Sequence, residues 1–267
     1  MASPFAQTKW HQNFGQIKKI RRHVRNLRRE GVKRNIVVSG YPKSGNTWLT
    51  RMLADAAESE MVAYLSDHRK TLPRERGMVG HEMRRDLVTV KSHHTVSLLR
   101  MGGIPLTDIV LVVRDPRDVA VSGSGFFFGA DNVPTPDSID RMIDMMVTKN
   151  KPYVRWEDQR WDQFVEHSLN RGVPFVRYVD LVHNTKNTLT PILNHLDLNL
   201  TDEAVDRVIA YHCFDRANKR YTQTGQTEIS RHLRSGKPGD YKKYLSIRQK
   251  DRIESEFGPL MKTLGYL

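Results

Sequence analysis

Short continuous apolar runs alternate with segments of helical periodicity along most of this chain. The apolar runs predict strands over residues 35–39, 87–92, 109–114 and 174–178. Apolar residues at helical spacing predict helices near 48–58, 116–127, 138–149, 157–170, 186–197, 202–211 and 247–263. Because strands buried on both faces read as unbroken apolar runs, this alternation predicts an α/β fold, a single domain with a mostly parallel central sheet flanked by helices.

A basic helix is predicted before the first strand, over residues 16–30. Four apolar residues recur in it at helical spacing, namely Ile17, Ile20, Val24 and Leu27. Seven basic residues occupy its other faces, namely Lys18, Lys19, Arg21, Arg22, Arg25, Arg28 and Arg29. We therefore expect residues 1–34 to form a basic helical extension packed on the domain, which comprises residues 35–267. Contact with a membrane surface or another polyanion is the alternative use of the basic face.

The composition excludes several classes of protein. With 38% hydrophobic and 27% charged residues, the 267-residue chain is composed like a globular protein and unlike a disordered one. Its longest aliphatic run, 109–113, is too short to cross a bilayer, and we expect neither a transmembrane segment nor a secretory leader. A single cysteine, Cys213, excludes an intramolecular disulfide and a cysteine-based zinc site, which favours a reducing, cytoplasmic location.

The charge balance indicates an anionic partner. Lys and Arg number 43 against 30 Asp and Glu, which gives a formal net charge of +13. Such an excess raises the local concentration of anions and speeds their capture. Nucleic acid, a membrane surface, an acidic acceptor and a multiply phosphorylated nucleotide would all suit it, so the partner must be inferred from motifs.

Residues 40–48, Gly-Tyr-Pro-Lys-Ser-Gly-Asn-Thr-Trp, are the most informative segment. They form a glycine-containing loop between the first predicted strand and a helix, where backbone N–H groups and the positive helix end suit a phosphate. The spacing of the glycines and the hydroxyl of Thr47 match a nucleotide-triphosphatase loop, G-x-x-x-x-G-K-[ST]. However, Asn46 stands where that loop has its lysine, and Lys43 lies inside the loop. This P-loop-like element therefore suits a phosphate but is poorly arranged for the β- and γ-phosphates of ATP.

Two further predicted strands end in residues that carry chemistry. Lys91 and His93 are two apart at a strand end and share a face, which suits an anionic electrophile together with a proton acceptor. Arg114 closes the next strand and presents a planar group with several donors at the same edge. Asp115 after it is a good helix N-cap. On the residues alone, solvated histidines and a surface salt bridge for Arg114 remain alternatives.

These motifs resemble those of the cytosolic-type sulfotransferases over residues 35–260. Residues 41–48 are similar to the signature Y-P-K-[ST]-G-[TN]-T-W, at which the family binds the 5′-phosphosulfate of 3′-phosphoadenosine 5′-phosphosulfate (PAPS). Lys91-Ser92-His93 is similar to K-[ST]-H, whose histidine is the general base. Residues 234–242 are similar to R-K-G-x-x-G-D-W-K, which completes the 3′-phosphate site, although Ser235 replaces the usual lysine.

The resemblance implies a role for individual residues. His93 would be the general base, Lys43 would neutralise the leaving 5′-phosphate, and Lys91 would hold the sulfuryl oxygens. PAPS would be bound by Lys43, Ser44, Gly45, Asn46, Thr47, Trp48, Arg114, Ser122, Tyr178, Phe214, Arg234, Ser235 and Gly236. The product nucleotide would be adenosine 3′,5′-bisphosphate (PAP), and no metal is expected.

The acceptor is expected to be a small molecule with a hydroxyl or amine. Its pocket would be built by residues 67–85, 123–136 and 223–231; the basic residues of the first stretch permit an acidic acceptor, and Phe126-Phe127-Phe128 permit an apolar one unless they are plain helix core. Residues 242–251 resemble the family's dimer segment, which implies a homodimer. No nucleic-acid partner is expected.

Two other functions fit parts of the pattern. An ATP-dependent kinase would use the same loop architecture, with Asp115 as a magnesium-binding acid, but it predicts a lysine at position 46. A non-enzymatic polyanion-binding protein would use the charge of +13, but it gives no reason for Lys91 and His93 to share a face.

Overall fold

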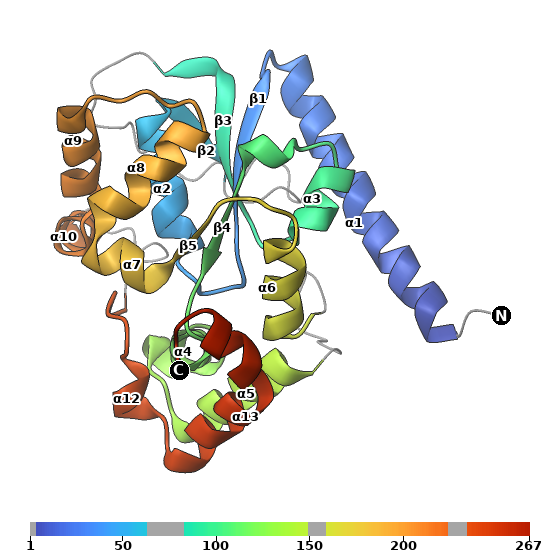
Figure 1. The fold of residues 1–267 in the computed structure, drawn as a ribbon, viewed down its shortest axis with the longest axis vertical. Helices are drawn as coiled ribbons and strands as arrows, with labels where there is room; N and C mark the ends of the chain where they lie inside the picture. Colours follow the sequence, from blue (N-terminus) through green and yellow to red (C-terminus); the bar gives the residue numbers. More distant parts are fainter. Residues whose placement is uncertain (1–3, 63–82, 149–158, 224–233) are drawn as a thin grey trace.

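In the part of the chain that the structure describes, the fold is built on one all-parallel sheet of five strands. The structure, a computed structural model, describes residues 4–62, 83–148, 159–223 and 234–267 (Figure 1). The strands are β1 (Arg34–Ser39), β2 (Ser59–Val62), β3 (Arg84–Ser92), β4 (Ile109–Val113) and β5 (Phe175–Arg177). Their order is β2-β3-β1-β4-β5, and every pairing is parallel. The predicted fold class is confirmed.

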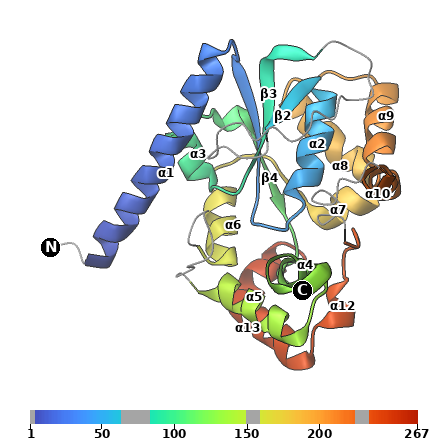
Figure 2. The ribbon, with the colours of Figure 1, turned by 180° about the vertical axis from the view of Figure 1, so that it is seen from behind.

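Helices cover both faces of the sheet and a helical layer extends beyond its carboxyl edge (Figures 1 and 2). They are α1 (Pro4–Arg29), α2 (Asn46–Ala56), α3 (Val96–Met101), α4 (Pro116–Phe128), α5 (Pro136–Val147), α6 (Trp161–Leu169), α7 (Tyr178–His183), α8 (Thr185–His195), α9 (Asp202–His212), α10 (Phe214–Gln223), α12 (Tyr241–Tyr244) and α13 (Ile247–Thr263). Short 3₁₀ turns span Leu106–Asp108 and Ala130–Asn132.

The four predicted strands are present, but several of their ends differ: β3 begins three residues before its predicted start, and Arg114 and Tyr178 lie just beyond β4 and β5. Tyr178 is not a strand residue but the first residue of α7. Asp180 in the first turn of this helix accepts from Arg177 at 2.7 Å, and a carboxylate there suits the positive helix end. β2, α3, α7, α10 and α12 were not predicted from the sequence.

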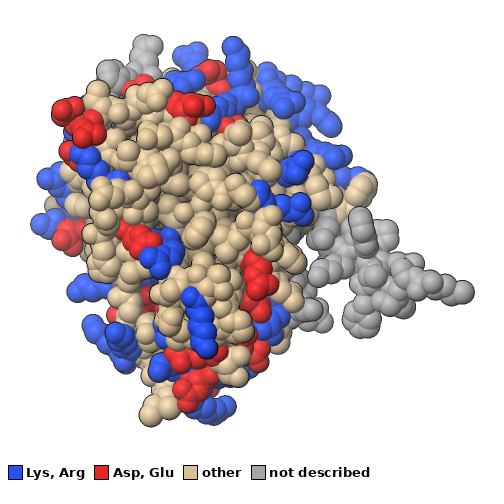
Figure 3. Space-filling view, in the orientation of Figure 1, with Lys and Arg blue, Asp and Glu red and all other residues tan. Residues whose placement is uncertain are grey.

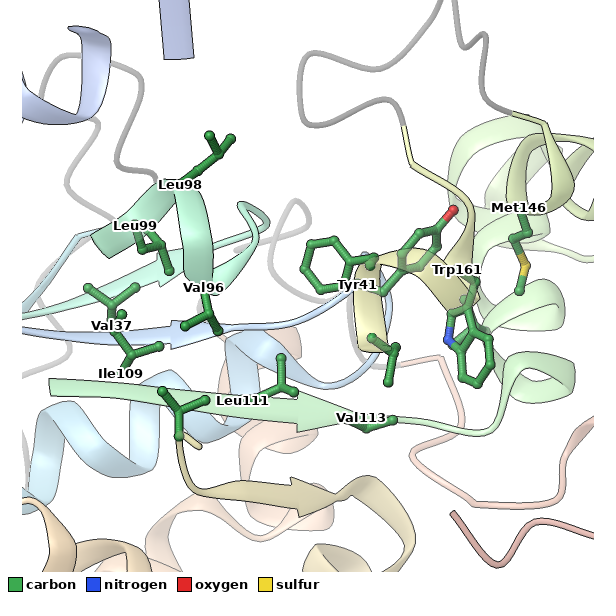
Figure 4. Packing of buried hydrophobic residues seen from close by; sticks show 14 of the residues in the cluster. Val37, Tyr41, Val96, Leu98, Leu99, Ile109, Leu111, Val113, Met146 and Trp161 are labelled. Atoms are coloured by element: carbon green, nitrogen blue, oxygen red, sulfur yellow. The ribbon is translucent and has the colours of Figure 1, made fainter. Parts of the chain in front are cut away.

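The central strands are buried on both faces, which explains their unbroken apolar sequences. On β1, Val37 belongs to one buried cluster, while Ile36 and Val38 belong to another on the opposite face. Figure 4 shows the first cluster, with Val37 and Leu111 of the strands packed beneath side chains of α3 and α6. The sheet is therefore the middle layer between two apolar cores.

Helix α1 lies against the domain by its apolar stripe. Ile17, Ile20, Val24 and Leu27 are each at most 5% exposed. Ile20 is packed so closely on Gly102 that a Cβ there would lie 2.2 Å from Ile20 Cγ2. No helix in the described part of the chain combines the length and apolarity that a bilayer span requires.

The sheet topology sets the place of the site. The chain leaves β1 toward β2 and β3 on one side, and β4 and β5 lie on the other side. Between β1 and β4 the connections therefore diverge, and in open α/β sheets ligands bind at such a point. Gly40, directly after β1, touches the neighbouring strand so closely that a Cβ would lie 2.5 Å from the carbonyl oxygen of Val112.

Candidate active site

The loop between β1 and α2 is shaped by two residues with left-handed backbone. Lys43 has φ 70° and Gly45, the N-cap residue of α2, has φ 104°. A Cβ on Gly45 would lie 2.6 Å from the ring of Tyr178, so a side chain is excluded there by both backbone and space. The loop thus delivers the N-terminus of α2, with its positive dipole end, to the carboxyl edge of the sheet.

Asn46 ties this loop to the neighbouring strand. Its side-chain Nδ2 donates to the carbonyl oxygens of Gly40 and Ser92, each at 3.0 Å. Both partners are acceptors, so the amide orientation is fixed, with Nδ2 toward them. The Asn46 side chain, at the position of the nucleotide-triphosphatase lysine, therefore holds the backbone on both sides of the site.

His93 is held in one tautomer. Its Nδ1 lies 2.9 Å from the carbonyl oxygen of Gly40, and because a carbonyl can only accept, Nδ1 carries the proton. The lone pair of the neutral ring then lies on Nε2. Burial, together with the charge of nearby Lys91, lowers the pKa of His93 to about 3, so the ring is neutral near pH 7. This neutral ring with Nε2 unprotonated is the form that a general base requires.

Two lysines border the same space. Lys91, only 3% exposed, donates from Nζ to Thr47 Oγ1 at 3.4 Å. Burial, with the charge of Arg51 as the second cause, lowers the pKa of Lys91 to about 8. The Nζ of Lys43 lies 3.7 Å from the ring centroid of Phe126, a cation–π contact that places its charge at the cavity.

Arg114 lies on the other side of the loop, at the end of β4. Its Nη1 donates to the carbonyl oxygen of Lys43 at 3.3 Å, and its guanidinium stacks 4.3 Å from the ring centroid of Tyr178. The hydroxyl of Tyr178 in turn donates to the carbonyl of Gly236 at 3.0 Å. These contacts connect β4, α7 and the loop before α12 around one point.

Aromatic residues form the wall beside α9 and α10. Trp48 packs edge-on to Tyr178 with centroids 5.9 Å apart, and its Nε1 donates to the carbonyl of His212 at 2.8 Å. A Cβ on Gly236 would lie 2.3 Å from the ring of Phe214, so the glycine loop rests directly on that ring. His212 Nε2 lies 3.1 Å from Asp55 Oδ2, and this pair joins α9 to α2.

An aspartate at each end holds the loop that contains Arg234. Arg234 Nη2 and Ser235 Oγ both donate to Asp240 Oδ2, at 2.6 and 3.0 Å. Asp118, in the first turn of α4, accepts from the backbone N–H of Gly239 at 2.8 Å. The serine that replaces the usual lysine therefore supports the loop through Asp240.

One cavity of about 410 Å³ collects nearly all the predicted site residues. Its lining includes Lys43, Gly45, Asn46, Thr47, Trp48, Lys91, His93, Arg114, Ser122, Tyr178, Phe214, Arg234, Ser235 and Gly236. Ser44 is the exception, because it is fully buried beneath the loop and is not part of the lining. Arg51 also lines the cavity and was missed, although its position one helical turn after Thr47 was a usable signal.

The cavity walls fit an anionic ligand. Arg114 Nε and Arg234 Nε are buried and have no hydrogen-bond partner among the described residues, and Arg114 Nε lies 3.9 Å from Asp118 Oδ2. Lys43, Lys91, Arg114 and Arg234 all line the same cavity as the loop at Gly45. This set of cationic and backbone donors suits a nucleotide that carries more than one phosphate.

Asp115, the acid that a kinase would need, is engaged elsewhere. Its Oδ1 accepts from the backbone N–H of Arg117 at 2.9 Å as the cap of α4, and its Oδ2 lies 2.6 Å from Arg117 Nη2. Within the ranges that the structure describes, no group of three or more His, Cys, Asp or Glu side chains is arranged to hold a metal ion.

Comparison with known proteins assigns the family. Residues 33–265 match the family model of the sulfotransferase domain. Sulfotransferase 1A1 of Canis lupus familiaris is 25% identical over 255 residues, which cover 86% of this chain and 84% of that protein. The structure of mouse sulfotransferase SULT7A1 complexed with PAP superposes with a TM-score of 0.64 at 17% identity, covering 86% of this chain and 85% of the other. Retinol dehydratase in complex with androsterone and PAP gives 0.58 at 18% identity, covering 85% and 80%. This chain belongs to the sulfotransferase family.

Proposed function

We propose that this protein transfers a sulfuryl group from PAPS to a hydroxyl or amine of a small acceptor, with His93 as the general base. The observation that carries the base assignment is the contact between His93 Nδ1 and the carbonyl oxygen of Gly40 at 2.9 Å. It directs the basic nitrogen away from the backbone and fixes the tautomer. The reaction class follows from membership of the sulfotransferase family.

Each charged residue would act on a different part of the reaction. PAPS supplies the sulfuryl group and an anionic leaving group. Lys43, beside the N-terminus of α2, would neutralise the charge that grows on the leaving 5′-phosphate. Lys91 would bind the sulfuryl oxygens, and His93 would remove the proton of the acceptor. Arg114 and Arg234, which both line the cavity, would bind the 3′-phosphate.

An apolar or aromatic acceptor suits the described part of the pocket best. Phe126 and Phe127 line the cavity that also contains His93, and retinol dehydratase binds androsterone in a related fold. Phe126 and Phe127 therefore contribute to a site as well as to packing. Most of the other predicted acceptor stretches, 67–85 and 223–231, lie outside the described residues. Among the basic residues that would favour an acidic acceptor, Arg84 and Arg85 are described, and they begin β3, where Arg84 pairs with Asp86 at 3.2 Å.

Two experiments test the proposal: the first identifies the acceptor, and the second tests His93 as the general base. A PAPS-dependent screen of phenols, sterols, amines and anionic sugars, measured as release of PAP, identifies the acceptor. We expect His93→Gln to lower kcat about 10²- to 10⁴-fold while the affinity for PAP stays within about threefold. His167→Gln, at an exposed position of α6, is the matched control and should retain full turnover. Full turnover of His93→Gln, or magnesium-dependent ATP hydrolysis in place of PAP release, would contradict the proposal.

Three further features stay predictions from the sequence. They are the cytoplasmic location, the homodimer through residues 242–251, and the division into a helical extension, 1–34, and a sulfotransferase domain, 35–267.

A further inference from the structure

Most of the excess positive charge is concentrated in α1. Residues 1–29 contain eight of the 43 Lys and Arg residues and no Asp or Glu. The rest of the chain contains 35 Lys and Arg residues and 30 Asp and Glu residues. The active site does not use this charge, because none of the described residues that line its cavity comes from α1. The basic helix therefore needs a separate explanation.

The exposed side of α1 forms a continuous stripe. The stripe consists of Phe14, Lys18, Arg22, Arg25 and Arg29, all of which are exposed. The four basic residues follow Phe14 by four, eight, eleven and fifteen positions, and this spacing places all five on one face of a helix. The buried stripe through Ile20 and Val24 lies opposite. In Figure 3, Lys and Arg side chains gather at the upper right, where Figure 1 shows the C-terminal half of α1.

Two large apolar side chains flank these charges. Phe14 is 54% exposed, and Met101 at the end of neighbouring α3 is 48% exposed. Lys18 Nζ lies 4.6 Å from the ring centroid of Phe14, and Arg21 Nε donates to the carbonyl of Met101 at 3.1 Å. Phosphate backbones of nucleic acids require only the charges. Exposed apolar side chains beside a basic stripe are instead the pattern of helices that lie in a lipid headgroup layer.

The stripe is presented on a fixed helix. Gln16 Oε1 lies 3.2 Å from Nε2 of buried His94, and Ile20 is packed against Gly102. Figures 1 and 2 show the helix running along the domain, with its N-terminal part projecting beyond the body from both viewpoints. A surface that is ordered before binding loses little conformational entropy when it docks.

We propose that α1 is a membrane-docking surface whose basic stripe binds anionic lipid headgroups while Phe14 and Met101 enter the interface. Each Lys or Arg near an anionic membrane strengthens binding roughly fivefold at physiological salt. Removing three of them should therefore weaken binding about 100-fold. The apolar contacts should make part of the binding resistant to salt.

The test compares two variants of equal charge. The first carries Arg22→Gln, Arg25→Gln and Arg29→Gln, and the control removes the same charge from exposed positions far along the chain, Lys243→Gln, Arg248→Gln and Lys262→Gln. Glutamine keeps the helix propensity of arginine, so both should fold. Sedimentation of the full chain with phosphatidylcholine vesicles, with and without about 30% phosphatidylserine, measures binding at low and physiological salt.

We expect binding only to the phosphatidylserine vesicles, a loss of about 100-fold in the α1 variant, and a loss below about fivefold in the control. Phe14→Ser should remove the salt-resistant fraction and leave the low-salt binding within about tenfold. Failure to bind the anionic vesicles, or equal losses in the two triple variants, would overturn the proposal. So would tight binding of duplex DNA without binding of vesicles, which would assign the surface to nucleic acid. None of these readouts depends on sulfotransferase activity.

Discussion

We expect deprotonation of Lys91 to slow the reaction at alkaline pH. Its pKa is lowered from 10.5 to about 8, chiefly by burial and then by the charge of Arg51. Below pH 8 the ammonium can bind the sulfuryl oxygens; above it, each pH unit removes the charged form about tenfold. We therefore expect kcat/KM to be level near neutral pH and to fall about tenfold per unit above pH 8. Bound PAPS is an anion and raises the pKa of Lys91, so the limit in kcat should lie at higher pH.

The titration of Lys91 should also change the stability of the fold, which rises with pH while the activity falls. The folded chain releases the Lys91 proton near pH 8 and the unfolded chain only near 10.5, so the unfolded state binds more protons between these values. The free energy of unfolding should therefore rise across this window, by about 3 kcal/mol when 2.5 pH units are converted at about 1.4 kcal/mol each. Activity is lost while the protein becomes more stable, which distinguishes the titration from alkaline unfolding.

Two variants isolate this effect. Lys91→Met has no charge to titrate, so the difference in its unfolding free energy from the wild type, measured in urea at pH 7.5 and 10.5, reports Lys91 alone. Lys91→Arg stays charged above pH 12, so the rate that remains should lose its limit near pH 8. A wild-type profile that is level to pH 10, or a limit that persists in Lys91→Arg, would refute the reasoning. So would a stability difference that does not change with pH.

Three other variants test the nucleotide site. Gly45→Ala places a methyl group 2.6 Å from the ring of Tyr178 at a backbone φ of 104°, so we expect a loss of about 2 kcal/mol or more of stability, and an unchanged melting temperature would contradict this geometry. Arg114→Lys loses the planar group, so calorimetry should show PAP affinity falling at least about tenfold with AMP affinity nearly constant; equal losses for both would exclude a 3′-phosphate role. Asp118 accepts from the backbone N–H of Gly239 through Oδ2 and from that of Tyr241 through Oδ1, whereas asparagine has a single acceptor oxygen. Asp118→Asn should therefore weaken PAP binding about tenfold, and an unchanged affinity would show that the loop is ordered without both bonds.

Burial explains which elements could be predicted from the sequence. β1 and β4 are apolar on both faces, so their sequences are unbroken and both were located nearly to the residue. β2 is a short edge strand, Ser-Glu-Met-Val, whose half-exposed middle carries no apolar run. α10 (Phe214–Gln223) is mostly polar in sequence and carries no apolar stripe that would predict a helix, so only its Phe214 was assigned a role, through the family resemblance. Such elements are specified by their neighbours more than by local pattern.

The sequence motifs identified residues of the site, but they could not identify the side chains with which those residues pair. Lys91 and His93 could be placed together because a strand has a fixed period of two. The pairing of Arg234 with Asp240 depends instead on how a loop folds, and its distance of 2.6 Å has no signature in spacing. The same holds for His212 and Asp55, which are far apart in sequence and were not connected before the structure was known.

Asn46 shows why this loop differs from its nucleotide-triphosphatase counterpart. The carbonyl oxygen of Gly40 accepts from Asn46 Nδ2 at 3.0 Å and lies 2.9 Å from His93 Nδ1, so the amide and the imidazole share one acceptor. A lysine at this position would add a further ammonium near His93, whose pKa is already lowered by the charges of Lys91 and Lys43. Like charge lowers the pKa of a histidine, and that of His93 is already about 3. A short neutral side chain orients the base without weakening it further, and the charge that the nucleotide needs is supplied by Lys43 from within the loop.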